Sequence, residues 1–150
     1  MASAPFAGRL AVVQIRQELP STTGPSVDAR LGIAIGLDVF FVVLFAALGR
    51  RSHEESGAFV DVFETAAPFL IGLAVGWLLV RAWRRPMSVM VAVAIWPITI
   101  LVGMIARRTL FDRGTAPSFV VVATLFIGLF LVGWRLVARV VERRRHSAPG

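Results

Sequence analysis

The chain has 150 residues, of which 57% are hydrophobic and only 17% are charged, and its formal net charge at pH 7 is +7. A soluble domain typically carries about 45–50% apolar and about 25% charged residues, so this composition excludes an ordinary soluble protein. The chain has no cysteine, which excludes disulfides, thiolate metal sites and a cysteine nucleophile.

The basic residues are 16 in number and all of them are arginine. They flank the apolar runs and form no basic stretch interleaved with aromatic residues, so orientation in a membrane and attraction to anionic headgroups account for them better than nucleic acid does. We therefore expect the lipid bilayer as the partner, no nucleic acid, and neither a cofactor nor a metal. Residues 1–30 are expected to form a flexible cytoplasmic tail, since residues 20–27 have the composition of a linker. Arg9 and Arg16 interrupt the only apolar run of this tail, which therefore does not resemble a signal peptide.

Four apolar runs follow, at about 31–49, 66–83, 87–106 and 117–136. Each is long enough to cross a hydrocarbon core of about 30 Å as a helix, and lipid cannot satisfy the backbone of an open strand. The predicted fold is an all-α membrane protein, with a four-transmembrane-helix bundle at 31–136 and a basic cytoplasmic tail at 137–150. Helix-end sequences that recur between alternate runs suggest two parallel-repeated helical hairpins; chance similarity of apolar runs is the alternative.

Asp38 is the only carboxylate deep inside any of these runs. A charge at the centre of a membrane helix costs about 2.5–3.5 kcal/mol, which is less than the roughly 4–7 kcal/mol supplied by the aliphatic and phenylalanine residues of the same run. Two interpretations remain open: a protonatable site for proton or cation coupling, or a carboxyl that joins helices by hydrogen bonds. In the second, Asp38→Asn should keep those bonds and change little.

Several residues of the later runs are candidates for a site around Asp38. Trp77 and Trp96 lie at a similar depth by residue count, and a buried indole N–H needs an acceptor. Arg81 either reaches inward to Asp38 or extends to the headgroups. Pro97 frees a backbone carbonyl beside Trp96 and should kink its helix.

Small residues spaced four apart predict close helix packing at Gly32 and Gly36 in the first run and at Gly72 and Gly76 in the second. The arginines predict orientation, since 11 would lie inside and 5 outside if both termini were cytoplasmic. We therefore expect a multi-pass protein of the cell inner (plasma) membrane, with Trp83 and Trp134 at the inner interface. The connection at 50–65 is expected to be extracytoplasmic and short of regular structure, apart from an amphipathic turn at Phe59 and Phe63.

No nucleotide-binding, zinc-protease or nucleophile-elbow motif is present, and we do not expect an enzyme. One candidate function is a small carrier or channel with Asp38 as its intramembrane protonatable site. It would act as an oligomer, because four short helices rarely enclose a pathway alone. The alternative is a non-transporting accessory or scaffold subunit of a membrane complex, docked through its glycine faces. A polar-lined cavity at Asp38 would favour the carrier, and a sealed Asp38 beside an exposed glycine ridge would favour the accessory subunit.

Short runs of the sequence resemble a known family. They are Asp38-Val-Phe-Phe, Phe45-Ala-Ala-Leu-Gly49-Arg50-Arg51-Ser52-His53, Thr65-Ala-Ala-Pro68-Phe69, Gly114-Thr115-Ala116-Pro117-Ser118-Phe119 and Gly133-Trp134-Arg135. Over residues from about 35 to 137 the chain is similar to the domain of unknown function 3054 family. The resemblance implies a small prokaryotic membrane protein and implies no established activity.

Overall fold

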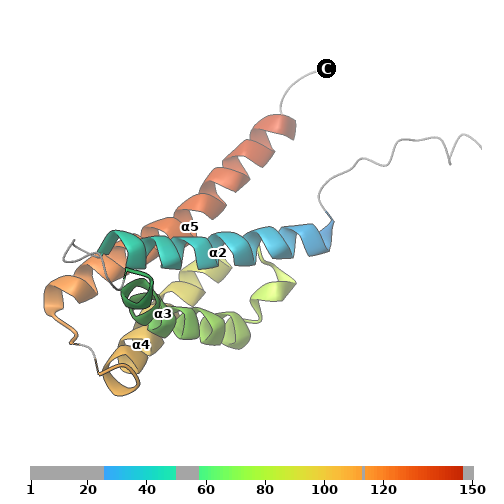
Figure 1. Cartoon of the computed structure of the whole chain (residues 1–150). Coiled ribbons are helices and arrows are strands. Elements are labelled where there is room, and N and C mark those ends of the chain that lie inside the picture. The colour runs from blue at the N-terminus through green and yellow to red at the C-terminus, as the bar shows by residue number, and fades with distance from the viewer. Residues whose placement is uncertain (1–25, 50–57, 113, 147–150) are drawn as a thin grey trace, which may run out of the picture.

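The computed structural model describes residues 26–49, 58–112 and 114–146. In these ranges the elements are α2 (Val27–Gly49), α3 (Ala58–Val80), the short 3-10 helix η1 (Ala82–Arg84), α4 (Val89–Thr109) and α5 (Pro117–His146) (Figure 1). All four α-helices contain a segment long and apolar enough to cross a membrane. The predicted all-α bundle of four membrane helices is confirmed.

The helices extend further than the apolar runs from which they were predicted. α3 begins at Ala58, so the segment just before Thr65 is continuous helix, where no more than an amphipathic turn at Phe59 and Phe63 was expected. α5 continues to His146, through most of the segment expected as a separate tail, and α2 begins inside the expected N-terminal tail. A hydropathy window finds the part of a helix that lipid covers, whereas polar residues can continue the same helix into water. Residues 1–25 and 50–57 lie outside the described residues.

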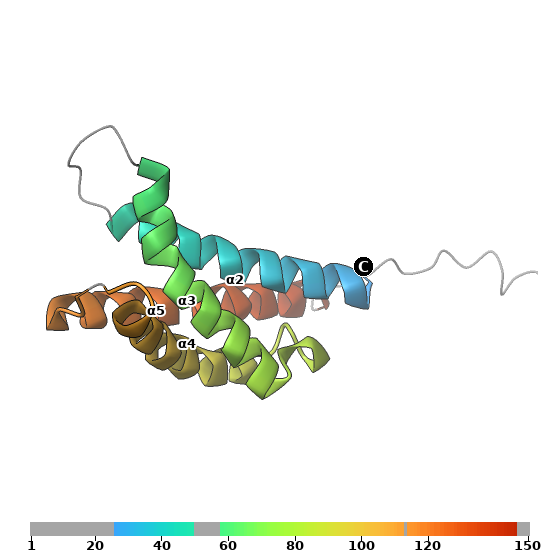
Figure 2. The same ribbon diagram turned by 60° about the horizontal axis from the view of Figure 1, so that its bottom comes forward.

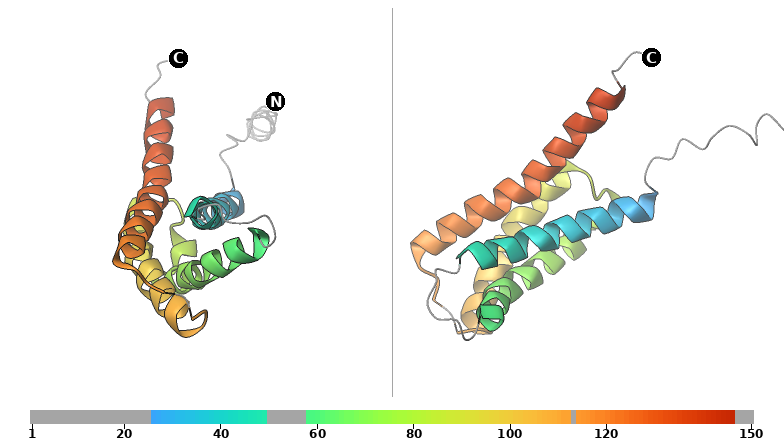
Figure 3. Two further views of the ribbon diagram at one scale, coloured as in Figure 1. Left: turned by 60° about the vertical axis from the view of Figure 1, so that its left-hand side comes forward. Right: turned by 45° about the horizontal axis from the view of Figure 1, so that its top comes forward.

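The helices pack in a ring, in which each contacts its neighbours in the chain and α2 also contacts α5, and the closest pair is α3 with α4. Figure 2 shows α3 running obliquely across α2. The N-terminal end of α2 and the C-terminal end of α5 lie on the same side of the bundle (Figure 3). There the Arg30 guanidinium lies 3.4 Å from the Glu142 carboxylate.

The α3–α4 contact depends on small residues, as predicted for Gly72 and Gly76. A Cβ atom added to Gly72 would lie 2.5 Å from the carbonyl oxygen of Thr99, and one on Gly76 would lie 3.1 Å from the Ile95 side chain. Side chains at these two positions would therefore separate the helices, and the prediction of close packing is confirmed here.

Gly32 and Gly36 do not pack against another helix within the described chain. Both residues are exposed on α2, and a Cβ atom on either would have no atom within 4 Å. The four-residue spacing places two glycines on one face of a helix, but it does not say whether another helix lies against that face. The two glycines form an exposed ridge instead.

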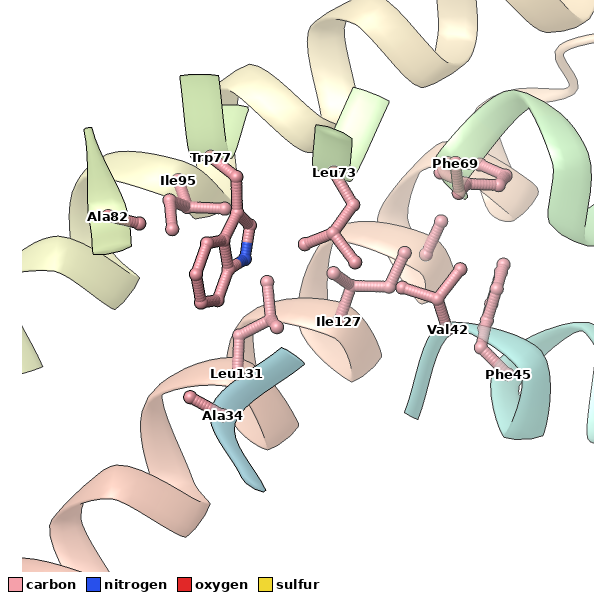
Figure 4. Packing of buried hydrophobic residues seen from close by; sticks show 11 residues of the cluster. Ala34, Val42, Phe45, Phe69, Leu73, Trp77, Ala82, Ile95, Ile127 and Leu131 are labelled. Atoms are coloured by element: carbon pink, nitrogen blue, oxygen red, sulfur yellow. The ribbon is translucent and has the colours of Figure 1, made fainter. Parts of the chain in front are cut away.

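The core lies where α3 faces α2 and α5. Its side chains from α3 follow the four-residue spacing of one helical face and point toward residues of α2 and α5 (Figure 4). The α3 members are Phe69, Leu73 and Trp77, and facing them are Val42 and Phe45 of α2 and Ile127 and Leu131 of α5. Trp77 lies in this core and also reaches the polar layer around Asp38.

Candidate functional site: a buried ion pair

Asp38 is the twelfth of the 23 residues of α2 and is fully buried. Its counter-ion is Arg135 of α5, which is also fully buried. The Arg135 Nη1 donates to Asp38 Oδ1 at 2.8 Å and Nη2 donates to Oδ2 at 2.8 Å. The planar guanidinium thus meets the carboxylate through two parallel bonds, which is the strongest geometry open to this pair.

Two indoles complete the coordination of the Asp38 carboxylate. Trp77 Nε1 of α3 donates to Oδ2 at 3.0 Å, and Trp134 Nε1 of α5 donates to Oδ1 at 2.9 Å. Each oxygen therefore accepts two hydrogen bonds. A carboxylate offers about four lone-pair positions, so protein donors occupy all of them.

Arg135 also bonds to the backbone around it. Its Nε donates to the carbonyl oxygen of Pro86 at 2.9 Å, and its Nη1 donates to that of Leu131 at 3.0 Å. The guanidinium carbon lies 4.4 Å from the centroid of the Trp134 ring, within cation–π range. Because Pro86 follows η1, this one side chain links α5 to α2 and to the turn between α3 and α4.

The two indoles also separate the ion pair from the lipid-facing surface. Trp77 lines an apolar groove of about 520 Å³ between α2 and α3, and Trp134 lines one of about 530 Å³ between α2 and α5. Neither Asp38 nor Arg135 lines either groove. The indoles therefore form the wall between these grooves and the charges.

The expected cluster of Asp38, Trp77 and Trp96 is correct for Trp77 and wrong for Trp96. Trp96 Nε1 donates instead to the carbonyl oxygen of Thr124 on α5, at 2.9 Å. Its ring lies against Gly128, where a Cβ atom would overlap the indole. Trp96 therefore faces Thr124 and Gly128 of α5, whereas Asp38 faces Trp134 and Arg135 further along the same helix.

The other two candidate residues lie outside the Asp38 site. Arg81 is exposed at the end of α3 with φ 53°, in the left-handed region, and the position it would have taken beside Asp38 belongs to Arg135. Pro97 is exposed on α4, which continues as one helix on both sides of it. It lines a groove between α4 and α5.

Arg135 and Trp134 were not expected at this site. Arg135 was one of the arginines expected on the inner side and Trp134 was expected at the membrane interface, whereas both bond to Asp38. A signal was present, because Arg135 falls inside the fourth apolar run and follows Ala123, Ile127 and Leu131 at four-residue spacing. All four residues are buried on one face of α5.

A search of curated proteins and a search of solved structures each found no match to this chain. One family model matches, over residues 35–138, and this range contains Asp38, Trp77, Trp134 and Arg135. The match covers more than half of the chain, so the protein belongs to the family described as protein of unknown function, DUF3054.

Proposed function

We propose that this membrane protein is a non-transporting accessory or scaffold subunit of a membrane complex, in which Asp38 has a structural role. The observation that carries the proposal is the complete use of the Asp38 carboxylate by Arg135, Trp77 and Trp134. A carrier site must exchange its proton or ion with water during each cycle. A buried carboxylate with four protein donors offers no position for a transported ion.

The ion pair between Asp38 and Arg135 can fix the alignment of the helices, which matters in a bundle surrounded by lipid. Lipid tails are as apolar as leucine, so apolar contacts alone select weakly among possible helix registers. Moving α2 by one residue would shift Asp38 by about 1.5 Å and rotate it by about 100°, which would break both bonds to Arg135. The ion pair therefore supports a rigid subunit with one arrangement of its helices.

The exposed ridge at Gly32 and Gly36 also favours this function over the carrier or channel. The ridge leaves the α2 backbone accessible to a helix of another subunit, as small residues do in membrane complexes. A transporter built on Asp38 would need a second conformation in which Asp38 and Arg135 separate, at the cost of two unpaired charges in the membrane.

Proton flux tests the proposal directly. Purified protein would be reconstituted into liposomes that contain a pH-sensitive dye, and a potassium diffusion potential would be imposed. We expect the same proton flux as in protein-free liposomes. Flux that rises with the amount of protein and disappears in a folded Asp38→Asn variant would overturn the proposal in favour of the carrier or channel.

We also propose a location in the bacterial inner membrane with both termini in the cytoplasm. Arg135 is buried, so it no longer counts among the inner arginines. The remaining 10 inner arginines against 5 outer ones still favour this orientation. The described ends of α2 and α5 lie on one side of the bundle (Figure 3), which suits it. Topology reporters fused after residues 57 and 150 should give opposite signals, and equal signals would contradict the orientation.

A further inference from the structure

A groove between α4 and α5 lies apart from the Asp38 site and has a volume of about 750 Å³. Along α4 it extends from Val93 to Arg108, a rise of about 22 Å for a helix of this length. Most of its wall is aliphatic. Arg108 and Thr115 both line the groove near the end where α4 passes into α5, so the groove is apolar along its length and polar at one mouth.

The inner wall of the groove is held in place by polar contacts. Trp96 packs into the space left by Gly128 and donates to the Thr124 carbonyl oxygen. The Thr124 hydroxyl donates to the carbonyl oxygen of Val120 at 2.7 Å. The indole N–H of Trp96 and the hydroxyl of Thr124 are thus hydrogen-bonded within the protein, so the middle of the groove presents apolar surface.

Two neighbouring arginines at the mouth differ in their contacts. Arg107 donates through Nε to the carbonyl oxygen of Gly114 at 3.1 Å, and its guanidinium carbon lies 4.2 Å from the centroid of the Phe119 ring. Arg107 thereby fastens the connection between α4 and α5. Arg108 is exposed, lines the groove, and makes no ion pair within the described part of the chain.

We propose that this groove binds one anionic phospholipid of the bilayer. The acyl chain would lie along α4 over Trp96 and Pro97, and the phosphate would bind Arg108, with Thr115 beside it. Charge complementarity carries the assignment, because a guanidinium binds a phosphate through paired hydrogen bonds. The groove is also longer than the hydrocarbon half of a bilayer of about 30 Å, so a whole acyl chain fits along it. The inference is independent of the proposed function.

Native mass spectrometry tests the site with phosphatidylglycerol and phosphatidylcholine as probes. The protein would be released from mixed micelles that contain both lipids in equal amounts. We expect preferential retention of phosphatidylglycerol, and about tenfold weaker retention in Arg108→Gln, which is the effect of losing one charge-assisted contact. The matched control is Arg139→Gln, which removes an exposed arginine of α5 outside the groove and should leave retention unchanged.

A second variant keeps the test independent of charge. Leu101 is 64% exposed and lines the groove, so Leu101→Trp should fill the groove without disturbing the core and should displace the lipid. Equal loss in Arg108→Gln and Arg139→Gln would show general attraction of lipid to basic residues and would overturn the site. Unchanged retention in Leu101→Trp, or no preference between the two lipids in the wild type, would also overturn it.

Discussion

Asp38 and Arg135 are individually costly in a membrane and become tolerable as a pair. Each ion loses its hydration on burial, and the cost is recovered only when the geometry is good and the remaining donors and acceptors are satisfied. Here the two charges share two hydrogen bonds, and indole and carbonyl groups occupy their other sides. The effect on stability of substituting Asp38 should therefore depend on whether Arg135 is present, and the reverse should also hold.

Asp38→Asn should destabilise the protein, contrary to the expectation drawn from the sequence. The asparagine amide oxygen can still accept two of the four bonds, but its NH2 group only donates and would face two donors. The substitution also leaves the Arg135 guanidinium as a buried charge with no counter-ion. Removing one partner of a buried pair costs about 3–5 kcal/mol. We expect a loss of this size in the free energy of unfolding, measured by denaturant titration in micelles.

The control for this loss is the paired apolar variant, Asp38→Leu with Arg135→Leu. Replacing both ions removes the unpaired charge, so the double variant should be more stable than either single variant. If the losses in the free energy of unfolding were additive, the two side chains would stabilise the bundle independently. This result would contradict their role as an ion pair.

Trp77 and Trp134 each supply one hydrogen bond to Asp38, and phenylalanine tests that bond while keeping an aromatic ring. Trp77→Phe and Trp134→Phe should each lower the free energy of unfolding by about 1.5–3 kcal/mol, the range for bonds to a charged group. Trp83→Phe is the matched control, because Trp83 is 44% exposed and makes no hydrogen bond through its side chain within the described residues. Equal effects at all three positions would argue against a specific role for the indole N–H groups.

α3 and α4 form the closest helix pair, and glycines on each helix let the backbone and side chains of the other approach closely. Gly72 and Gly103 allow this approach, since a Cβ atom on Gly103 would lie 2.7 Å from the Phe69 ring. The turn between these two helices carries the Pro86 carbonyl that accepts from Arg135. Tight α3–α4 packing therefore supports one side of the ion-pair site.

Gly72→Ala and Gly36→Ala make a matched pair of substitutions on two helices. Alanine at 72 would meet the Thr99 backbone and should cost about 1–3 kcal/mol through overpacking. Alanine at 36 meets no atom within 4 Å and should be neutral or stabilising by up to about 1 kcal/mol, because glycine is a poor helix former. Thermal unfolding in micelles would compare them, and a loss confined to Gly36→Ala would contradict the packing described here.

The bundle as a whole is closed by the contact between its first and last helices. α2 and α5 meet at the ion pair and again at the Arg30–Glu142 bridge. The second contact is exposed, and such bridges contribute about 0–1 kcal/mol, so the buried pair is the stronger link across this interface. Among the polar contacts, closure therefore depends mainly on Asp38 and Arg135, and ring contacts such as Phe41 with Phe130 add to it.

Cross-linking checks this closure, and the chain suits it because it contains no cysteine. The double substitution Arg30→Cys with Glu142→Cys should give an intramolecular product with a short bismaleimide, since the two native side chains lie 3.4 Å apart. Arg30→Cys with Arg108→Cys is the control, because Arg108 lies near the opposite end of the bundle, and it should give no intramolecular product. A product in the control alone would exclude the ring of helices.

Residue types and their order predict the class of this protein, the four spans and the importance of Asp38. Those conclusions depend on local quantities, namely the length of an apolar run and the cost of a charge within it. The partners of Asp38 depend on the direction each helix faces. The count along the chain gives Trp77 and Trp96 a similar depth, yet only Trp77 bonds to Asp38. Arg135 and the exposed glycine ridge follow from how α2, α3 and α5 meet, because a helix repeats the same spacing whichever neighbour it contacts.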